Sequence, residues 1–211
     1  MGMGTIATLA ALVLGLLIAT TKGTYDTQSG TVKELAAKVL LLDRVLAKYG
    51  PETKPARDLL HSMVEATLDR IWPQDSGREA NLTPGEFRAA GEAMYDKIAE
   101  LSPQNDAQRA LKARALDITA DIAQTRLRLF AQQQSSLPLP LLVVLVFWLS
   151  ILFAGYGLLA PANATVLAVL IVCALSLSGA IFLMLELATP FAGTMRVSGA
   201  PLRDALSLIG Q

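Results

Sequence analysis

Residues 139–159 read LPLLVVLVFWLSILFAGYGLL, and after a turn of five residues positions 165–187 read TVLAVLIVCALSLSGAIFLMLEL. The first stretch contains no charged residue and the second contains one, Glu186. A helix that crosses a bilayer needs roughly 20 mostly apolar residues, because the hydrocarbon core is about 30 Å thick and each residue advances about 1.5 Å. The two stretches therefore predict a hairpin of membrane-spanning helices.

A third hydrophobic stretch, Gly4–Thr20, lies at the N-terminus and is also free of charge. A cleavable signal peptide is the alternative, but the segment has no basic region before it and no clear small-x-small cleavage site after it. We therefore expect an all-α integral membrane protein with three transmembrane helices and a cytoplasmic helical bundle. Three spans would leave the N-terminus outside, and a further membrane helix ahead of Gly4 stays an open alternative.

The charged residues are confined to the middle of the chain. Hydrophobic residues make up 53% of the sequence, yet 16 of the 18 Lys and Arg and 16 of the 18 Asp and Glu lie between Lys22 and Arg128. The net charge is zero, so no basic surface is predicted for nucleic acid. With one cysteine, Cys173, and one histidine, His61, we expect no disulfide, no metal site and no cofactor.

The orientation follows from the positive charges near the ends of the spans, which are Lys22, Arg126, Arg128, Arg196 and Arg203. The turn at 160–164 carries no charge, so the positive-inside rule places both the middle region and the C-terminus in the cytoplasm. We expect a multi-pass protein of the bacterial inner (plasma) membrane. Its expected parts are a transmembrane helix (1–21), a cytoplasmic domain of about four helices (22–137), a transmembrane hairpin (138–190) and a cytoplasmic tail (191–211).

Turn and capping signals mark the ends of several helices. Asn163 or Thr165 is expected to cap the third span after Pro161, and the glycosylation-like triplet Asn-Ala-Thr at 163–165 is interpreted as turn chemistry. Gly50-Pro51 should end the first helix of the middle region, and a second should run from Glu52 or Pro55 to Trp72. A third should begin at Thr83-Pro84-Gly85-Glu86, which combines an N-cap, proline at the first position and a capping box.

Apolar periodicity predicts how these helices pack. The first middle helix carries a coiled-coil-like seam at positions three and four residues apart: Val32, Leu35, Val39, Leu42, Leu46 and Tyr49. The last one, expected over Pro103–Gln133, has one apolar stripe of Leu111, Ala115, Ile118, Ile122 and Leu129. Its second stripe is formed by Leu116, Ala120, Ala123, Leu127 and Phe130. Two stripes give a broad apolar face, so we expect this helix in the centre of a bundle.

The first span has small residues at every fourth position, namely Ala7, Ala11, Gly15 and Ala19, with Thr5 and Thr8 nearby. Such a face lets helix backbones approach closely in lipid. Two interpretations remain open: it lies around an oligomer axis or pore, or it packs inside one subunit. Glu186 is the one carboxylate in a span, and we interpret it as interfacial rather than as a buried functional acid paired with Lys22, Arg128 or Arg196.

An enzyme is not expected. The sequence has no nucleophile elbow, no glycine-rich phosphate loop and no HExxH helix. The neighbouring carboxylates Asp117 and Asp121 are explained by Lys112 and Arg114 as an ion-paired solvated face.

Several stretches resemble the bacterial bestrophin-like membrane proteins. These are GTIATLAALVLGLLIA (4–19), LLDRVLAKYGP (41–51), DRIWP (69–73), ELATPFAG (186–193) and APLR (200–203), and the resemblance covers nearly the whole chain. The tail motif of Glu186, Pro190, Phe191 and Gly193 is similar to the Pro-Phe-Gly segment that follows a bestrophin membrane helix. Thr189 and the residue between Phe191 and Gly193 depart from that pattern.

The resemblance implies an oligomeric anion channel, because bestrophins are such channels, and it implies one more N-terminal membrane helix in most members. The expected partners are the lipid bilayer, further copies of the chain and a small inorganic ion. We expect the oligomer to form through the small-residue face and the seam Val32–Tyr49. The alternative is a non-conducting membrane scaffold whose helical bundle docks a cytoplasmic protein.

Overall fold

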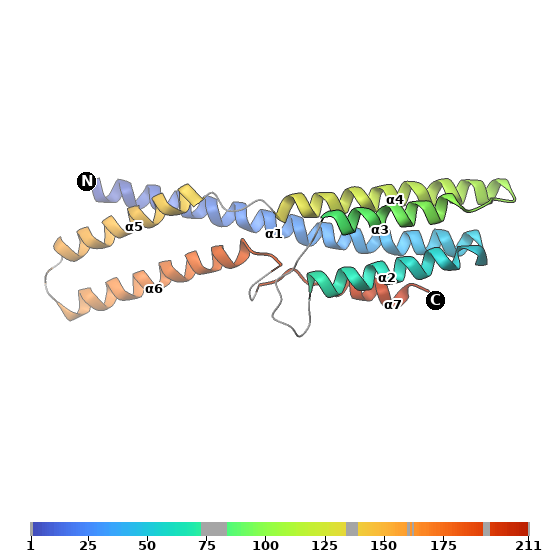
Figure 1. Ribbon diagram of the computed structural model, residues 1–211. Helices are drawn as coiled ribbons and strands as arrows, with labels where there is room; N and C mark the ends of the chain where they lie inside the picture. The colour runs from blue at the N-terminus through green and yellow to red at the C-terminus, as the bar shows by residue number, and fades with distance from the viewer. Residues whose placement is uncertain are drawn as a thin grey trace. The chain divides into compact units, whose positions relative to one another are not determined.

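The structure is a computed structural model that describes residues 2–72, 84–133, 139–159, 161, 163–191 and 195–210. Within these ranges it contains helices and no strand. The helices are α1 (Gly2–Tyr49), the 3-10 turn η1 (Pro51–Thr53), α2 (Lys54–Ile71), α3 (Pro84–Ala99), α4 (Asp106–Gln133), α5 (Leu139–Leu159), α6 (Ala164–Leu187) and α7 (Ala200–Leu208) (Figure 1). The prediction of an all-α membrane protein is confirmed.

Three helices are long and apolar enough to cross a membrane: α1 from Gly4, α5 from Pro140, and α6 over its full length. The chain divides into two compact units, which we call the membrane unit (1–26 and 135–196) and the bundle unit (27–134 and 197–211). These limits differ from the segment boundaries expected from the sequence, because residues 22–26 stay with the spans and residues after Arg196 fold onto the bundle.

The membrane unit has an apolar interior in which α1, α5 and α6 contribute residues. Its buried members are Ala10, Leu17, Leu145, Leu152 and Met184. The turn before α6 is capped as expected: the Asn163 side chain accepts a hydrogen bond from the backbone N–H of Thr165 at 3.1 Å. This geometry supports the interpretation of the Asn-Ala-Thr triplet as turn chemistry.

The bundle unit contains the second part of α1 together with α2, α3, α4 and α7, and Figure 1 shows α3 beside α4. Its core includes the whole seam of α1, each member of which is at most 5% exposed: Val32, Leu35, Val39, Leu42, Leu46 and Tyr49. The seam is therefore covered inside one subunit. The expectation that it joins subunits was wrong, because the seam is buried within the chain itself, where Leu35 and Leu42 line a cavity together with residues of α2, α3 and α4.

The start of α4 differs from the expected Pro103 and lies at Asp106. The Asn105 side chain accepts a hydrogen bond from the Gln108 N–H at 2.8 Å, and the Gln108 side chain accepts one from the Gln104 N–H at 2.7 Å. This arrangement resembles a capping box, except that the Gln108 side chain bonds the N–H of the residue before the cap, and it marks the helix start. The capping box proposed at Thr83 lies outside the described residues, although α3 does begin at Pro84.

The expected central position of α4 was also wrong. Its first stripe is buried at Ala115, Ile118, Ile122 and Leu129, but Ala120 and Ala123 of the second stripe are exposed and Leu127 is 67% exposed. The helix covers the core with one face and leaves the other uncovered. The sequence shows both stripes but contains no information about how many neighbours the helix has.

Candidate membrane face and family-motif tail

Of the four small residues on the first span, three lie on the outside of the membrane unit. Ala11, Gly15 and Ala19 are exposed, whereas Ala7 is half-buried and packs against the membrane-unit core. A methyl group added at Gly15 would meet no atom within 4 Å. The subunit packs instead through another side of α1, which carries Ala10 and Leu17. The face formed by Ala11, Gly15 and Ala19, which we call the small-residue face, is therefore uncovered in the subunit.

Large apolar residues flank this face. Leu12 is 71% exposed and Leu16 is 61% exposed. In lipid the exposure of these leucines carries no free-energy penalty, because hydrocarbon tails are as apolar as leucine. Close contact between membrane helices depends instead on packing at small residues. The core of the membrane unit therefore leaves the small-residue face uncovered.

Of the two threonines near the face, Thr8 turns its hydroxyl toward its own helix. Thr5 and Thr8 are both exposed, and the Thr8 hydroxyl donates a hydrogen bond to the Thr5 carbonyl at 2.9 Å. Further along, the hydroxyl of Thr21 donates to the Leu17 carbonyl at 2.7 Å. This pattern satisfies hydroxyl groups at membrane depth. An anion passing Thr8 would have to draw its hydroxyl away from that carbonyl.

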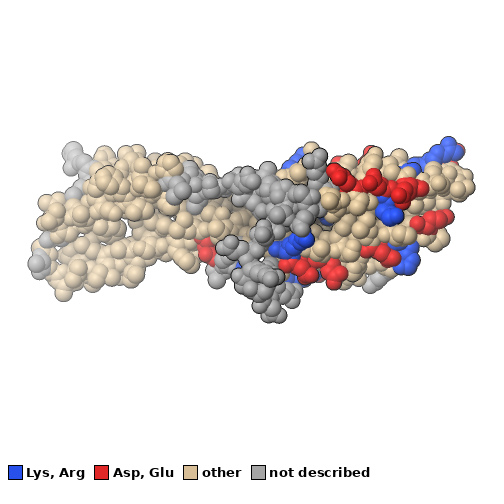
Figure 2. Space-filling model, viewed as in Figure 1, with Lys and Arg blue, Asp and Glu red and all other residues tan. Residues whose placement is uncertain are grey.

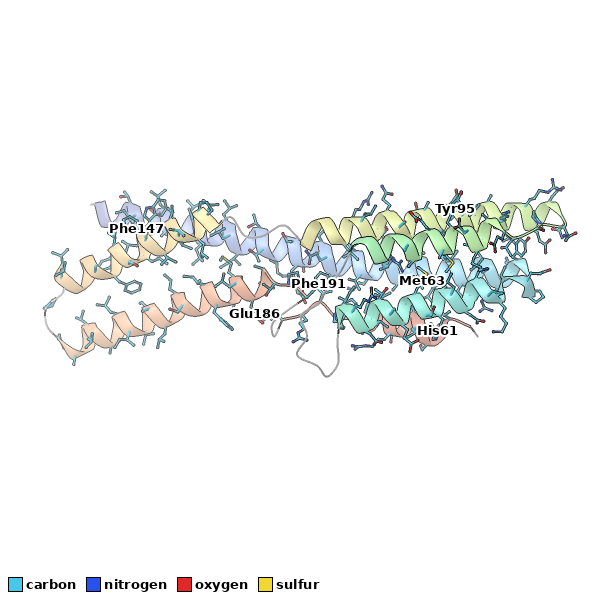
Figure 3. All side chains as sticks on the ribbon, viewed as in Figure 1. His61, Met63, Tyr95, Phe147, Glu186 and Phe191 are labelled. Carbon is cyan, nitrogen blue, oxygen red and sulfur yellow. The ribbon has the colours of Figure 1, made fainter. Side chains whose placement is uncertain are left out.

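Glu186 is the second-last residue of α6 (Figure 3). It is half-buried, and its carboxylate accepts a hydrogen bond from the backbone N–H of Met195 at 3.1 Å. This hydrogen bond joins Glu186, at the start of the family-motif segment, to Met195, nine residues further along the chain. Pro190 is buried and Phe191 is half-buried, while Gly193 lies outside the described residues.

Two successive backbone carbonyls, at the point where the chain passes from the membrane unit to the bundle unit, accept side-chain hydrogen bonds. The Arg196 carbonyl accepts a long hydrogen bond from the Tyr25 hydroxyl at 3.4 Å, inside the membrane unit. In the bundle unit, the Val197 carbonyl accepts one from the Trp72 indole N–H at 2.6 Å, and both residues are buried. Gly199 packs under the indole ring, since a Cβ placed there would lie 2.9 Å from Trp72 Cδ2.

The sequence analysis missed this junction and the helix that follows it. Helix α7 packs on α2 and buries Leu202, Ala205 and Ile209, whereas we expected only a tail. The signal was present: Gly199-Ala200-Pro201 is a typical helix start, and the three apolar residues recur at steps of three and four.

Charged groups within the described parts of the spans are few. Lys22 pairs with Asp26 one turn away at 2.6 Å, on the exposed surface beyond the first span. In the described residues no group of three His, Cys, Asp or Glu side chains could hold a metal ion. Figure 2 shows the contrast in composition, with Lys, Arg, Asp and Glu spread over the bundle unit and none on the visible surface of α5.

The described residues form three helices of membrane-spanning length and a separate helical bundle that carries most of the charged residues. These features define an integral membrane protein with an apolar membrane unit and a charged bundle unit. The model of the bestrophin-like domain matches residues 2–202. The chain therefore belongs to the bestrophin-like family.

Solved structures agree with this assignment at the level of the fold. The chain is similar to two crystal structures of a bacterial bestrophin homologue from Klebsiella pneumoniae, each carrying one mutation. The TM-scores are 0.73 and 0.65, the sequence identity is 15% in both, and the match covers 100% of this chain and 87% of each of those chains. Among curated proteins, no sequence matches this chain.

Proposed function

We propose that this protein is the subunit of a homo-oligomeric ion channel in the bacterial inner membrane, selective for small anions. Family membership supports the general class, because bestrophins are oligomeric anion channels. The observation that carries the proposal is the uncovered small-residue face of α1, Ala11, Gly15 and Ala19, on a helix long enough to span the bilayer. A pore between subunits needs such a close helix contact around its axis.

The proposed orientation places the bundle unit in the cytoplasm. Lys22 and Arg196 lie at the charged ends of the spans, whereas Pro161 and Asn163 in the opposite turn carry no charge. This distribution follows the positive-inside rule. The membrane unit would then contact lipid through the large apolar residues that it exposes, such as Phe147 and Leu175.

The proposed ion path contains no side chain of positive charge. Within the described parts of the three spans, from Gly4 to Thr21 and along α5 and α6, there is no Lys or Arg. Anion selection would therefore depend on helix N-termini, on the hydroxyls of Thr5 and Thr8, and on an apolar constriction that gates by losing its water.

The test is ion flux from proteoliposomes that contain the purified protein, with chloride and potassium gradients compared side by side. We expect chloride flux that exceeds potassium flux and that is lost in the double variant Ala11→Leu/Gly15→Leu. The matched control is Ala154→Leu/Gly157→Leu, which enlarges two exposed small residues on α5 and should conduct as the wild type does. Absence of flux in folded, oligomeric wild-type protein would contradict the proposal.

A second function has a specific observation in its favour. The uncovered stripe of α4, with Ala120, Ala123 and Leu127, is the kind of surface on which a protein partner docks. In that case the protein is a non-conducting membrane scaffold. Stoichiometric co-purification of one cytoplasmic protein, lost in the variant Leu127→Glu, together with silent proteoliposomes, would favour the scaffold over the channel.

A further inference from the structure

Two helices of the bundle unit each expose an apolar strip. On α1 the strip lies on the side opposite the buried seam, where Ala37 is exposed and Leu41 is 43% exposed. On α4 it is the second stripe, where Ala120 and Ala123 are exposed and Leu127 is 67% exposed. Neighbouring apolar residues exposed together on a charged helical unit commonly mark a contact with another protein surface.

The charges beside the two strips have opposite signs. On α1, Arg44 follows Leu41 on the same side of the helix and is exposed. On α4, Asp117 and Asp121 flank Ala120 and are both exposed. In the part of the chain that the structure describes, Arg44 and the two aspartates form no ion pair. The two strips are therefore complementary to each other in charge as well as in apolar character.

The ion pairs that we expected for the two aspartates on their own helix are not found among the described residues. Lys112 Nζ donates instead to the carbonyls of Ala99 and Leu101 at 2.6 and 2.8 Å. Asp117 and Asp121 thus keep their charges available for a partner outside the subunit.

Contacts inside the subunit show which residues of α1 and α4 lie at the same height along the bundle unit. Lys38 Nζ donates to the Thr125 hydroxyl at 2.9 Å, and the Gln108 side-chain amide donates to the Tyr49 carbonyl at 3.1 Å. The two helices are therefore antiparallel. Because every helical residue advances by the same distance, counting from the two contacts places Asp117 level with α1 positions between about 40 and 46.

A ring of identical subunits keeps these heights when its axis is parallel to the two helices, because rotation about an axis moves no residue along it. In such a ring, the second stripe of one subunit can meet the α1 strip of the next. Asp117 is then level with Arg44 of the neighbouring subunit, and Ala120 is level with Leu41 of that subunit. The small alanine side chains leave room for the leucine.

The remaining charges on α4 favour this register over others. Arg114 lies one turn before Asp117 and is exposed, and it carries the same charge as Arg44. A shift of the two helices by about one turn would bring these two arginines together. Like charges placed opposite each other disfavour a contact, so the ion pair selects one register.

We propose that the second stripe of α4 docks on the α1 strip of a second copy of the chain, with an ion pair between Asp117 and Arg44. The inference rests on the homo-oligomer of the proposed function and assigns the surfaces that join its bundle units. The contact is heterologous, because the two surfaces differ, and it therefore repeats around a ring.

The experiment is cysteine crosslinking between two full-length chains with different affinity tags, co-expressed in a Cys173→Ser background. One chain carries Ala120→Cys and the other Leu41→Cys. With a short bismaleimide we expect a crosslinked pair that contains both tags. Replacing Leu41→Cys by Ala66→Cys, an exposed position on α2, should abolish the crosslink. Absence of the expected pair, or crosslinking of Ala120→Cys with itself, would overturn the proposal.

Charge reversal tests the ion pair. Asp117→Arg in both chains should lower the initial rate of crosslinking about threefold or more, and Arg44→Asp should act in the same way. The two changes combined should restore the rate, because the pair is then re-formed with its signs exchanged. Glu65→Arg, an exposed charge reversal on α2, should leave the rate unchanged. Failure of the double variant to recover would overturn the assigned pair.

Chloride flux measured on the same preparations separates this inference from the proposed function. Crosslinking without flux would support the contact and contradict the channel. Flux without crosslinking would support the channel and overturn the contact. A cytoplasmic protein that co-purifies in stoichiometric amount, prevents crosslinking and is lost in Leu127→Glu would overturn the contact in favour of the scaffold.

Discussion

The hydroxyl of Tyr49 is buried at the end of the α1 seam, and it has no hydrogen-bond partner among the residues that the structure describes. A buried polar group that leaves water without a replacement bond costs about 1–3 kcal/mol. We predict that Tyr49→Phe stabilises the bundle unit by about 1 kcal/mol, measured as a higher midpoint of thermal unfolding by circular dichroism. A loss of stability in this variant would indicate that the hydroxyl is bonded in solution.

The same residue predicts a dependence on alkaline pH. Burial, and then the charge of Glu52, raises the pKa of Tyr49 above its ordinary value of 10. The unfolded chain therefore loses this proton first, so the contribution of Tyr49 to stability falls as the pH rises above about 10. We expect the advantage of Tyr49→Phe over the wild type to widen between pH 9 and pH 11. Parallel curves would contradict this.

Gly199 is required by the ring of Trp72 rather than by an unusual backbone angle. Because an added Cβ would lie 2.9 Å from the indole, Gly199→Ala must displace the ring from its hydrogen bond with Val197. We predict a loss of about 1–3 kcal/mol in the unfolding free energy. The control Gly30→Ala meets no atom within 4 Å on an exposed helical position and should stabilise slightly.

At the scale of elements, α1 and α2 are joined by a buried ion pair. Arg57 Nε and Nη2 donate to the two carboxylate oxygens of Asp43 at 2.7 and 3.0 Å, and only 6% of the Asp43 side chain is exposed. The hydrogen bond to Asp43 raises the pKa of Arg57. The turn between the two helices is held by Thr53, whose one hydroxyl proton is shared between the carbonyls of Leu46 and Gly50, 2.7 and 2.8 Å from the hydroxyl oxygen.

We predict that Asp43→Asn destabilises the bundle unit by about 3–5 kcal/mol, because it leaves the Arg57 charge partly buried without its carboxylate. The control is Asp58→Asn, which removes the partner of Lys54 in a pair whose side chains are 75% and 64% exposed. That change should cost less than about 1 kcal/mol. Chemical denaturation of the two variants in the same detergent compares them directly, and equal losses would refute the argument.

At the scale of the whole molecule, the uncovered small-residue face predicts an oligomer. Ala11→Leu/Gly15→Leu should reduce the mass measured by light scattering in mild detergent, because the larger side chains prevent close approach of helix backbones. The variant Ala154→Leu/Gly157→Leu should keep the wild-type mass. An unchanged mass in the α1 variant would mean that subunits, if they associate, use another surface.

Hydrophobicity alone determined the three spans, because a segment that must satisfy its backbone in lipid is helical whatever surrounds it. Local chemistry likewise determined the Asn163 cap and the start of α3 at Pro84. The period-four pattern on α1 also showed that Ala11, Gly15 and Ala19 share one face.

Only the tertiary structure decided which faces are covered. The seam Val32–Tyr49 and the second stripe of α4 look alike in sequence, yet the first is buried within the subunit, whereas Ala120, Ala123 and Leu127 of the second are exposed. The junction of Trp72 with Gly199 and the docking of α7 likewise depend on residues far apart in the chain. The physical reason is that the spacing of apolar residues in the sequence shows which side of a helix is apolar. Whether that side is buried depends on which other helix packs against it.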